Sequence, residues 1–135
     1  MKKEIMFEAI KQAEKAYRID EVPVGAVIVK NNKIISKAYN KIEKTKDATN
    51  HAEIIAIKKA SKKVKNWRLI DCDLYVTLEP CEMCKGAIKN SRINNIFYIV
   101  SQDNYKNNTC TFNKFDIETT IYLNMLKNFF KEKRK

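Results

Sequence analysis

The sequence predicts a layered α/β domain, because segments with helical and strand patterns alternate along the chain. An amphipathic helix comes first, a strand hairpin follows, and the order helix, strand, helix, strand comes next. Such an order builds a sheet in which an antiparallel pair is extended by crossover units. We therefore expect a central mixed sheet of about five strands, flanked by helices.

The first part of the chain is predicted to form one helix and one hairpin. Apolar residues recur at helical spacing over residues 3–19, which indicates an amphipathic helix. The run VGAVIV at 24–29 is typical of a buried strand, Asn31-Asn32 of a tight turn, and residues 33–39 of the partner strand. A polar loop is expected over residues 40–50.

The second part of the chain is predicted to alternate helices and strands. From His51 to about Val64 the apolar residues keep a helical period, while lysines occupy the other faces. Residues 101–114 carry no clear pattern. The other expected elements are strands at 74–78 and 96–100, a short helix at 81–90 that Pro80 helps to initiate, a short fifth strand near Phe115–Glu118, and a last amphipathic helix over 121–130.

Size and charge narrow the class of protein. The 135 residues suffice for one hydrophobic core, so we expect a single domain over residues 1–135. The 27 Lys and Arg residues against 16 Asp and Glu residues give a net charge of +11. Such an excess attracts polyanions, nucleic acid first among them. A solubilising surface, or a coding bias that favours lysine, would give the same count.

The chain is expected to work in the cytoplasm, without a membrane partner. Charges interrupt its N-terminal segment every few positions, so it lacks the apolar run of a signal peptide, and nothing approaches the length of a membrane span. In the cytosol the four cysteines, at 72, 81, 84 and 110, are poor candidates for disulfides. The close pair at 81 and 84 is better explained as a metal or redox element.

Two short motifs carry the candidate chemistry, HAE at 51–53 and PCEMC at 80–84. Cys81 and Cys84 project from one face of a first helical turn, where unpaired backbone N–H groups favour thiolates. His51, the chain's one histidine, can supply a third ligand from the start of another helix. Three protein ligands leave a tetrahedral zinc one open position, as in catalytic sites, where bound water has a pKa of about 7. Glu53 is free to move protons.

Each half of this pattern also has a simpler interpretation. Asn50 to Glu53 fits a capping box, in which Glu53 only serves the helix end. The close cysteine pair alone fits half of a structural zinc site completed by Cys72 and Cys110, or a redox pair. Structural sites usually combine two closely spaced pairs, however, and Cys72 and Cys110 are isolated. The conjunction of both motifs is much rarer than either part and favours a catalytic zinc.

An H-x-E motif followed at a distance by P-C-x-x-C is the signature of the zinc nucleobase deaminases. The chain resembles the bacterial tRNA-specific adenosine deaminases (TadA type), within the cytidine deaminase-like superfamily. This resemblance implies the three-layer fold of that superfamily. The segments that carry it are EVPVGAV (21–27), Asn40, HAEI (51–54), WRLIDCDLYVTLEPCEMC (67–84), GA (86–87), SRI (91–93) and NFFKEKRK (128–135).

The resemblance implies an activity and a set of partners. The activity is hydrolytic conversion of the wobble adenosine of a tRNA anticodon to inosine, usually in the tRNA that reads arginine codons. A homodimer with one zinc ion per subunit would perform it, with both subunits touching the RNA.

The resemblance also implies roles for individual residues. His51, Cys81 and Cys84 match the zinc ligands, and Glu53 matches the proton shuttle. The residues that match the nucleoside-binding positions are Asn40, Gly25 and Ala26. The candidate RNA contacts in the basic tail are Lys131, Lys133, Arg134 and Lys135.

The sequence departs from the family pattern in two places. Residues 102–114 are shorter than the loop that follows SRI in the family, and they lack its glycine. Asn90 stands before Ser91 where a histidine is common. Gly25 has a structural alternative as well, because an isolated glycine in a strand often marks a bulge.

Two other functions use the same motifs. A deaminase of a free base or nucleotide, such as guanine, cytosine or deoxycytidylate, would share the metal site, but it would not need so large a basic excess. A non-catalytic RNA-binding module could keep zinc for stability, but it would have no use for Glu53 as a proton shuttle. RNA binding should weaken steeply as salt rises, whereas turnover of a free base should not.

Overall fold

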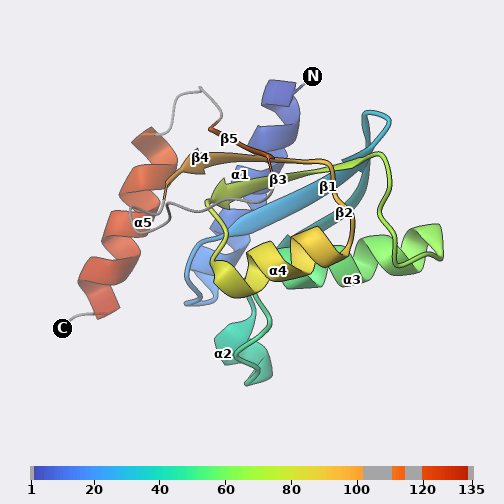
Figure 1. Ribbon diagram of the computed structural model, residues 1–135. Coiled ribbons are helices and arrows are strands. Elements are labelled where there is room, and N and C mark those ends of the chain that lie inside the picture. The colour runs from blue at the N-terminus through green and yellow to red at the C-terminus, as the bar shows by residue number, and fades with distance from the viewer. Residues whose placement is uncertain (1, 102–110, 115–119, 134–135) are drawn as a thin grey trace.

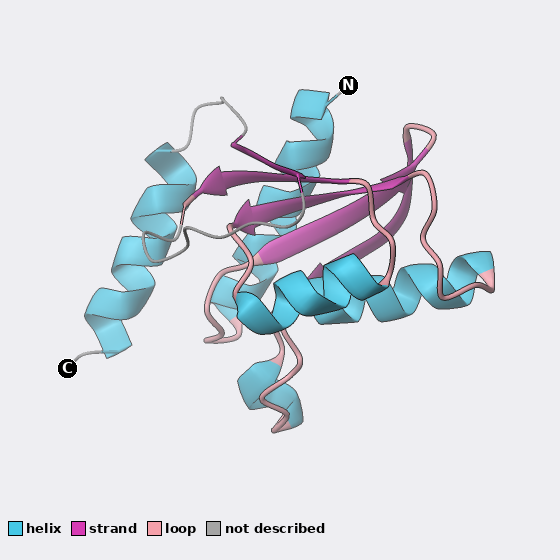
Figure 2. Cartoon of the chain, in the orientation of Figure 1, coloured by secondary structure: helices cyan, strands magenta, loops and turns pink. Residues whose placement is uncertain are grey.

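The part of the chain that the structure describes forms a mixed five-stranded sheet with helices on both faces (Figure 1). The computed structural model describes residues 2–101, 111–114 and 120–133, and the side chains of 2–101 and 120–132. The three-layer arrangement of helices, sheet and helices confirms the predicted fold class (Figure 2).

The sheet combines an antiparallel half with a parallel half. Its strand order is β2-β1-β3-β4-β5, antiparallel across β2-β1-β3 and parallel across β3-β4-β5. The helix between β3 and β4 makes the crossover that their parallel pairing requires. The strands are β1 (Gly25–Lys30), β2 (Lys33–Tyr39), β3 (Cys72–Leu78), β4 (Asn95–Val100) and β5 (Thr111–Lys114).

The helices divide between the two faces of the sheet. α3 and α4 cover one face, α1 and α5 pack on the other, and α2 lies beyond the end of the sheet (Figure 1). None of the described helices combines the length and apolar composition needed to span a bilayer. They are α1 (Lys2–Arg18), α2 (Ile42–Thr45), α3 (Ala52–Val64), α4 (Glu82–Asn90) and α5 (Thr120–Lys133).

Alternate residues of β1 supply the two hydrophobic cores. Ala26 and Ile28 belong to the core under α3 and α4, whereas Val27 and Val29 belong to the core under α1 and α5. α3 contributes small residues, Ala52, Ala56 and Ala60, at a spacing of four. Because alanine side chains are short, this helix can lie close to the sheet.

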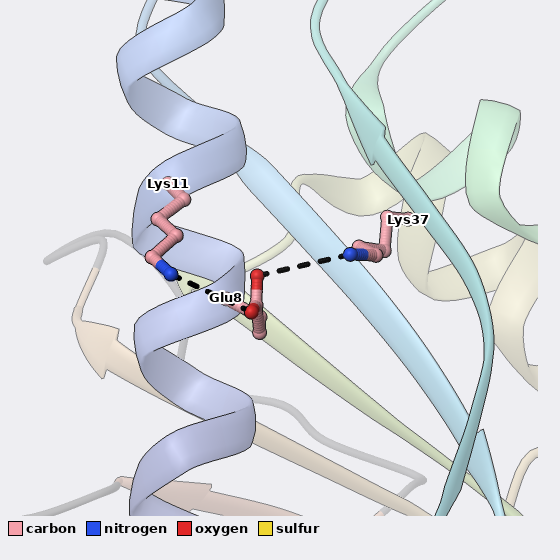
Figure 3. Close-up of polar contacts among 3 residues, drawn as sticks. All are labelled: Glu8, Lys11 and Lys37. Atoms are coloured by element: carbon pink, nitrogen blue, oxygen red, sulfur yellow. Dashed lines mark ion pairs between the residues drawn. The ribbon is translucent and has the colours of Figure 1, made fainter.

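Charged contacts on the outside of α1 add little to this packing. Glu8 lies between two lysines, with Oε1 3.6 Å from Lys11 Nζ and Oε2 3.8 Å from Lys37 Nζ of β2 (Figure 3). Exposed pairs of this kind each contribute about 0–1 kcal/mol. The position of α1 is therefore set mainly by its apolar face.

At Gly25 the backbone of α1 packs directly against β1. A Cβ atom at this position would overlap the carbonyl oxygen of Ala9 and would lie 2.6 Å from the backbone nitrogen of Ala13. The register irregularity of β1 falls between Ile28 and Val29 instead. Helix packing, and not a bulge, therefore explains the glycine.

The predicted polar loop at 40–50 contains a short helix, α2, that sequence patterns did not reveal. The buried carboxylate of Glu21 accepts hydrogen bonds from the backbone N–H groups of Glu43 (3.2 Å) and Lys44 (2.8 Å). This cap comes from a distant part of the chain. The predicted fifth strand near Phe115–Glu118 lies outside the described residues, and the fifth strand observed is β5.

Candidate metal centre

The two motifs place His51 and Cys81 at the starts of two neighbouring helices. His51 is the N-cap residue of α3 and Cys81 that of α4, both with extended backbone angles. Neither side chain caps its own helix. Cys84 follows one turn into α4, on the buried side. All three side chains are therefore available to bind a common ligand at a point where two helix N-termini meet.

The donor atoms of these three residues converge. The Sγ atoms of Cys81 and Cys84 lie 3.7 and 3.5 Å from Nδ1 of His51, and all three donor atoms lie within 4.8 Å of one another. A tetrahedral zinc, with Zn–S of about 2.3 Å and Zn–N of about 2.0–2.1 Å, separates sulfur from nitrogen by about 3.6 Å. The spacing and the chemistry of the donors therefore fit zinc.

The two thiols differ in acidity. A hydrogen bond from Cys84 is the largest of the effects that lower the pKa of Cys81 to about 5, and burial opposes it. The pKa of Cys84 is raised, first by this hydrogen bond to Cys81 and then by burial. Cys81 is thus a thiolate at neutral pH even before a cation enters, which favours metal binding.

Glu53 lies beside the converging donors in a buried position. Burial raises its pKa from the usual 4.5 to about 7, and the charge of Cys81 adds to the shift, whereas hydrogen bonds from its own backbone and from Cys84 oppose it. An acid that titrates near 7 can accept and return a proton at physiological pH. Glu53 therefore has the acidity that a general acid and base requires.

The simpler interpretations of the two motifs do not match this geometry. Asn50 is not the N-cap of α3, and its Nδ2 donates to Thr45 Oγ1 at 2.7 Å. Cys72 is buried at the start of β3, at the opposite end of that strand from the metal cluster, and it is not part of the cluster. Cys110 lies outside the described residues.

The side chain that caps α3 belongs to Asn40, and not to Asn50 or to the N-cap residue His51. The Oδ1 atom of Asn40 accepts a 2.7 Å hydrogen bond from the backbone N–H of Ala52. Its side-chain NH2 group has no hydrogen-bond partner among the described residues. Asn40 is buried and lines the cavity beside the metal cluster, so this NH2 group can donate to a ligand there.

The cavity at the cluster has a volume of about 160 Å3. Typical pockets for drug-sized ligands measure about 300–1,000 Å3, so this one suits a single flat base. A hollow of about 820 Å3 adjoins it at Val22 and Ile42 but touches none of the three metal-binding side chains. The cavity is lined by Val22, Val24, Asn40, Ile42, His51, Glu53, Leu78, Glu79 and Cys81.

The other sequence-predicted site residues are placed differently. Gly25 and Ala26 are the first two residues of β1 and directly follow the cavity residue Val24. Both are buried, and neither lines the cavity. Lys131 is exposed on α5. The side chain of Lys133, and all of Arg134 and Lys135, lie outside the described residues. Asn90 ends α4 on its exposed side.

Sequence patterns did not point to Glu79, which lines the cavity, or to Tyr122, which supports one of its walls. Glu79 lines the cavity, and its Oε2 lies 3.4 Å from Nζ of Lys85, with both side chains buried. The feature of the sequence that could have identified Glu79 is its position directly before Pro80 of the PCEMC motif. Tyr122 of α5 donates a 2.8 Å hydrogen bond to the carbonyl of Pro23, which holds the segment between Val22 and Val24. No local pattern connects Tyr122 with that segment.

Comparisons with known proteins agree with this geometry. A family model described as MafB19-like deaminase matches residues 1–134. The tRNA-specific adenosine deaminase of Rickettsia bellii (strain RML369-C) is 44% identical over an alignment that covers 96% of this chain and 99% of that protein.

Solved structures show the same likeness. One, from a study of A-to-I editing by tRNA:A34 deaminases at the wobble position of transfer RNA, matches with a TM-score of 0.78 at 31% identity, over 84% of this chain and 98% of that chain. The guanine deaminase of Bacillus subtilis matches with a TM-score of 0.70 at 28% identity, over 96% and 93% of the two chains. The fold is therefore the predicted cytidine deaminase-like fold, and the chain belongs to the MafB19-like deaminase family, in the group that contains the tRNA-specific adenosine deaminases.

Proposed function

We propose that this protein is a zinc-dependent tRNA adenosine deaminase that hydrolyses the wobble adenosine of an anticodon to inosine and ammonia. The observation that carries the proposal is the convergence of His51, Cys81 and Cys84 beside the buried carboxyl group of Glu53, at one end of a base-sized cavity. The 44% identity to a tRNA-specific adenosine deaminase supports the choice of substrate.

In this proposal His51, Cys81 and Cys84 hold one zinc ion per subunit. Zinc supplies Lewis-acid chemistry that makes water a nucleophile at neutral pH. Glu53 accepts a proton from the attacking water, which forms a C–O bond at C6 of the adenine. Glu53 delivers that proton to N1, takes the second proton of the water from the new hydroxyl group at C6, and passes it to the amino nitrogen. The C6–N bond then breaks, ammonia leaves, and C6 keeps the oxygen as the carbonyl of inosine. Water is consumed, and no redox partner is needed.

Asn40 positions the nucleoside in this scheme. Its Oδ1 is occupied by the N–H of Ala52, so the NH2 group is the part that faces the ligand as a donor. The apolar side chains of Val24, Ile42 and Leu78 offer flat contact surfaces in the same cavity. Direct nucleoside contacts from Gly25 and Ala26 remain a prediction from the family resemblance. A cavity of about 160 Å3 holds the base alone, so the nucleotide must be extruded from the RNA to react.

The partners and location complete the proposal. We propose that residues 1–135 form one catalytic domain, that it acts as a homodimer in the cytoplasm, and that the arginine tRNA is its substrate. Lys131 on α5, together with Lys133, Arg134 and Lys135, would contact the RNA. The net charge of +11 supports a polyanionic substrate over a free base.

The test is to incubate the purified protein with an anticodon stem-loop RNA that carries adenosine at the wobble position, and then to digest the RNA and measure inosine. Parallel reactions contain free adenosine, guanine or cytosine, with ammonia release as the readout. We expect inosine from the stem-loop only.

The matched variant for this test is Glu53→Gln. It should keep zinc and lose turnover by several orders of magnitude, because the amide cannot accept the proton. Normal turnover by Glu53→Gln would overturn the assignment of Glu53. Turnover of guanine without inosine formation would favour the free-base deaminase that the Bacillus subtilis likeness suggests. RNA binding without ammonia release from any substrate would favour a non-catalytic RNA-binding module.

A further inference from the structure

A second hollow, of about 570 Å3, lies along one side of α3 and is rich in lysine. Ile55, Lys58, Lys59 and Lys62 line it from one face of the helix, at positions i, i+3, i+4 and i+7. Lys41, which precedes α2, also lines the hollow. We call this hollow the lysine groove.

The lysine groove concentrates positive charge. Lys59 Nζ donates to the carbonyl of Lys37 at 3.0 Å, and Lys41 Nζ lies 4.8 Å from the ring centroid of Tyr39, but neither contact supplies a negative charge. Among the described residues, no carboxylate lies within ion-pair distance of any of its four lysines. Partial burial, followed by the charges of Lys41 and Lys15, lowers the pKa of Lys59. The pKa of Asp47 is lowered, first by hydrogen bonds from Thr49 and to a smaller extent by the charge of Lys58. Like charges gathered in a concave surface are repulsive unless an anion joins them.

The lysine groove begins next to the metal centre. Asn50 lines the groove, and its neighbour His51 lines the cavity at the metal cluster. Lys41 in the groove follows Asn40 in the cavity, and the N–H of Lys41 donates to the carbonyl of Asn50 at 3.1 Å. A helix rises about 1.5 Å per residue, so Lys58 and Lys62 lie about 10 and 16 Å along the helix axis from His51.

We propose that the lysine groove binds the sugar-phosphate backbone of the RNA segment next to the nucleotide in the cavity. This inference rests on the proposed function and adds a path for the substrate to it. Lys58 and Lys62 are exposed and follow one another by a helical turn, so both ammonium groups can reach successive phosphates. Ile55, which lies between His51 and Lys58 along α3, adds an apolar side chain to the lining of the groove.

An RNA strand fits the lysine groove better than a second copy of this chain does. A second copy also carries a net charge of +11, so long-range repulsion opposes its approach to this surface. An RNA backbone carries one negative charge per nucleotide, and its condensed counterions are released on binding to lysine. Contacts of this kind position the RNA without reading its sequence.

The test compares two double variants that each remove two exposed lysines. The groove variant is Lys58→Gln with Lys62→Gln. The control variant is Lys3→Gln with Lys33→Gln, at the N-terminus of α1 and the tip of the hairpin. Both control positions lie away from the metal centre. The cavity is lined by Val22 and Val24, between the end of α1 and the start of β1, whereas Lys3 is at the start of α1 and Lys33 follows the far end of β1. Each protein is measured for stem-loop RNA affinity over a salt series, for KM and kcat of inosine formation, and for oligomeric state by sedimentation.

We expect the groove variant to raise KM roughly 3- to 30-fold, with kcat within about twofold of the unmodified protein, because phosphate contacts bind substrate and transition state alike. The slope of log affinity against log salt should fall by about 1.4–1.8, the value for two lost phosphate contacts. The control variant should match the unmodified protein in both quantities.

Three results overturn this inference. They are equal effects of the two double variants, a fall in kcat with KM unchanged, and a change of oligomeric state with RNA affinity unchanged, which would make the groove a protein interface. If the unmodified protein binds RNA but forms no inosine, the proposed function fails while the affinity series still tests the groove. If it binds no RNA at all, both fail.

Discussion

The side-chain oxygen of Asn40 accepts a 2.7 Å hydrogen bond from the backbone N–H of Ala52, the first residue of α3. One buried side chain therefore fixes the start of the helix that carries His51 and Glu53, and it also presents its NH2 group to the cavity. The support of the metal centre and the recognition of the nucleoside meet at this residue.

Replacements at Asn40 should separate these two roles. Asn40→Ala removes the cap and should cost about 0.5–2 kcal/mol of unfolding free energy. Asn40→Asp keeps an acceptor at a helix N-terminus and should be closer to the unmodified protein in urea unfolding. Both should lose inosine formation, because neither can donate to the nucleoside. An aspartate variant as unstable as the alanine variant would contradict the capping role, and a fully active one would contradict the donor role.

Replacement of single cysteines should identify the metal ligands. Cys81→Ser should reduce bound zinc from one per chain to near zero, because one of three donors is weakened. Cys72→Ala should retain zinc, since Cys72 is not part of the cluster. Chelation should abolish inosine formation, and added zinc should restore it. The measurement is the metal content of the purified variants. Loss of zinc in Cys72→Ala would reopen the structural four-cysteine alternative.

The buried carboxyl group of Glu53 should make the metal-free protein less stable as the pH rises. Its pKa is about 7 in the folded protein against the usual 4.5, so between these values the folded state holds a proton that the unfolded chain has lost. Unfolding free energy should therefore fall by roughly 3 kcal/mol across this window and level off above it. The difference between the unmodified protein and Glu53→Gln, from urea unfolding at a series of pH values, isolates this contribution. A flat difference curve would show that the folded-state pKa is not raised.

Gly25→Ala should destabilise the protein although it adds only a methyl group. The added carbon would overlap the carbonyl of Ala9, and both partners are backbone, so α1 must move away from the sheet. Overpacking of this kind costs about 1–3 kcal/mol. Gly86→Ala is the control, because nothing lies within 4 Å of its added carbon. Thermal unfolding of the two variants should differ clearly, and equal melting temperatures would contradict the close packing.

Lys85 and Glu79 form a buried ion pair whose two members should depend on each other. Their side chains are 9% and 5% exposed, so removal of one leaves the other charge buried. Lys85→Met should cost about 3–5 kcal/mol, whereas the double variant with Glu79→Gln should recover part of this loss. A double-mutant cycle of unfolding free energies measures the coupling. Strictly additive losses would show that the pair does not act as a unit.

The features that sequence analysis predicted correctly depend on local spacing. Helical periodicity predicted α1, α3 and α5, and strand patterns predicted β1 to β4, each to within about three residues of its observed ends. The convergence of His51 with Cys81 and Cys84 was also foreseen, because each motif carries its ligand spacing within a few residues. That the two motifs lie close together in the fold could be inferred only because both occur in the same chain.

The features that were missed depend on contacts between distant segments. Local spacing favoured Asn50 as the cap of α3, whereas the observed cap is Asn40, from the end of β2. α2 is capped by Glu21 and has no signal of its own. Gly25 is required by the close packing of α1 and not by a bulge, and this requirement depends on a helix that is distant from the strand in local pattern.

Cys84 has two tasks that Cys81 does not share. Its side chain is completely buried in the hydrophobic core with Ala52 and Ile88, and its sulfur is also one of the three converging donors. Cys81 lies at the margin of that core and is half-buried. A protein engineer who wishes to change the preferred ion should therefore alter position 81, where a new donor disturbs little packing, and leave position 84 as it is.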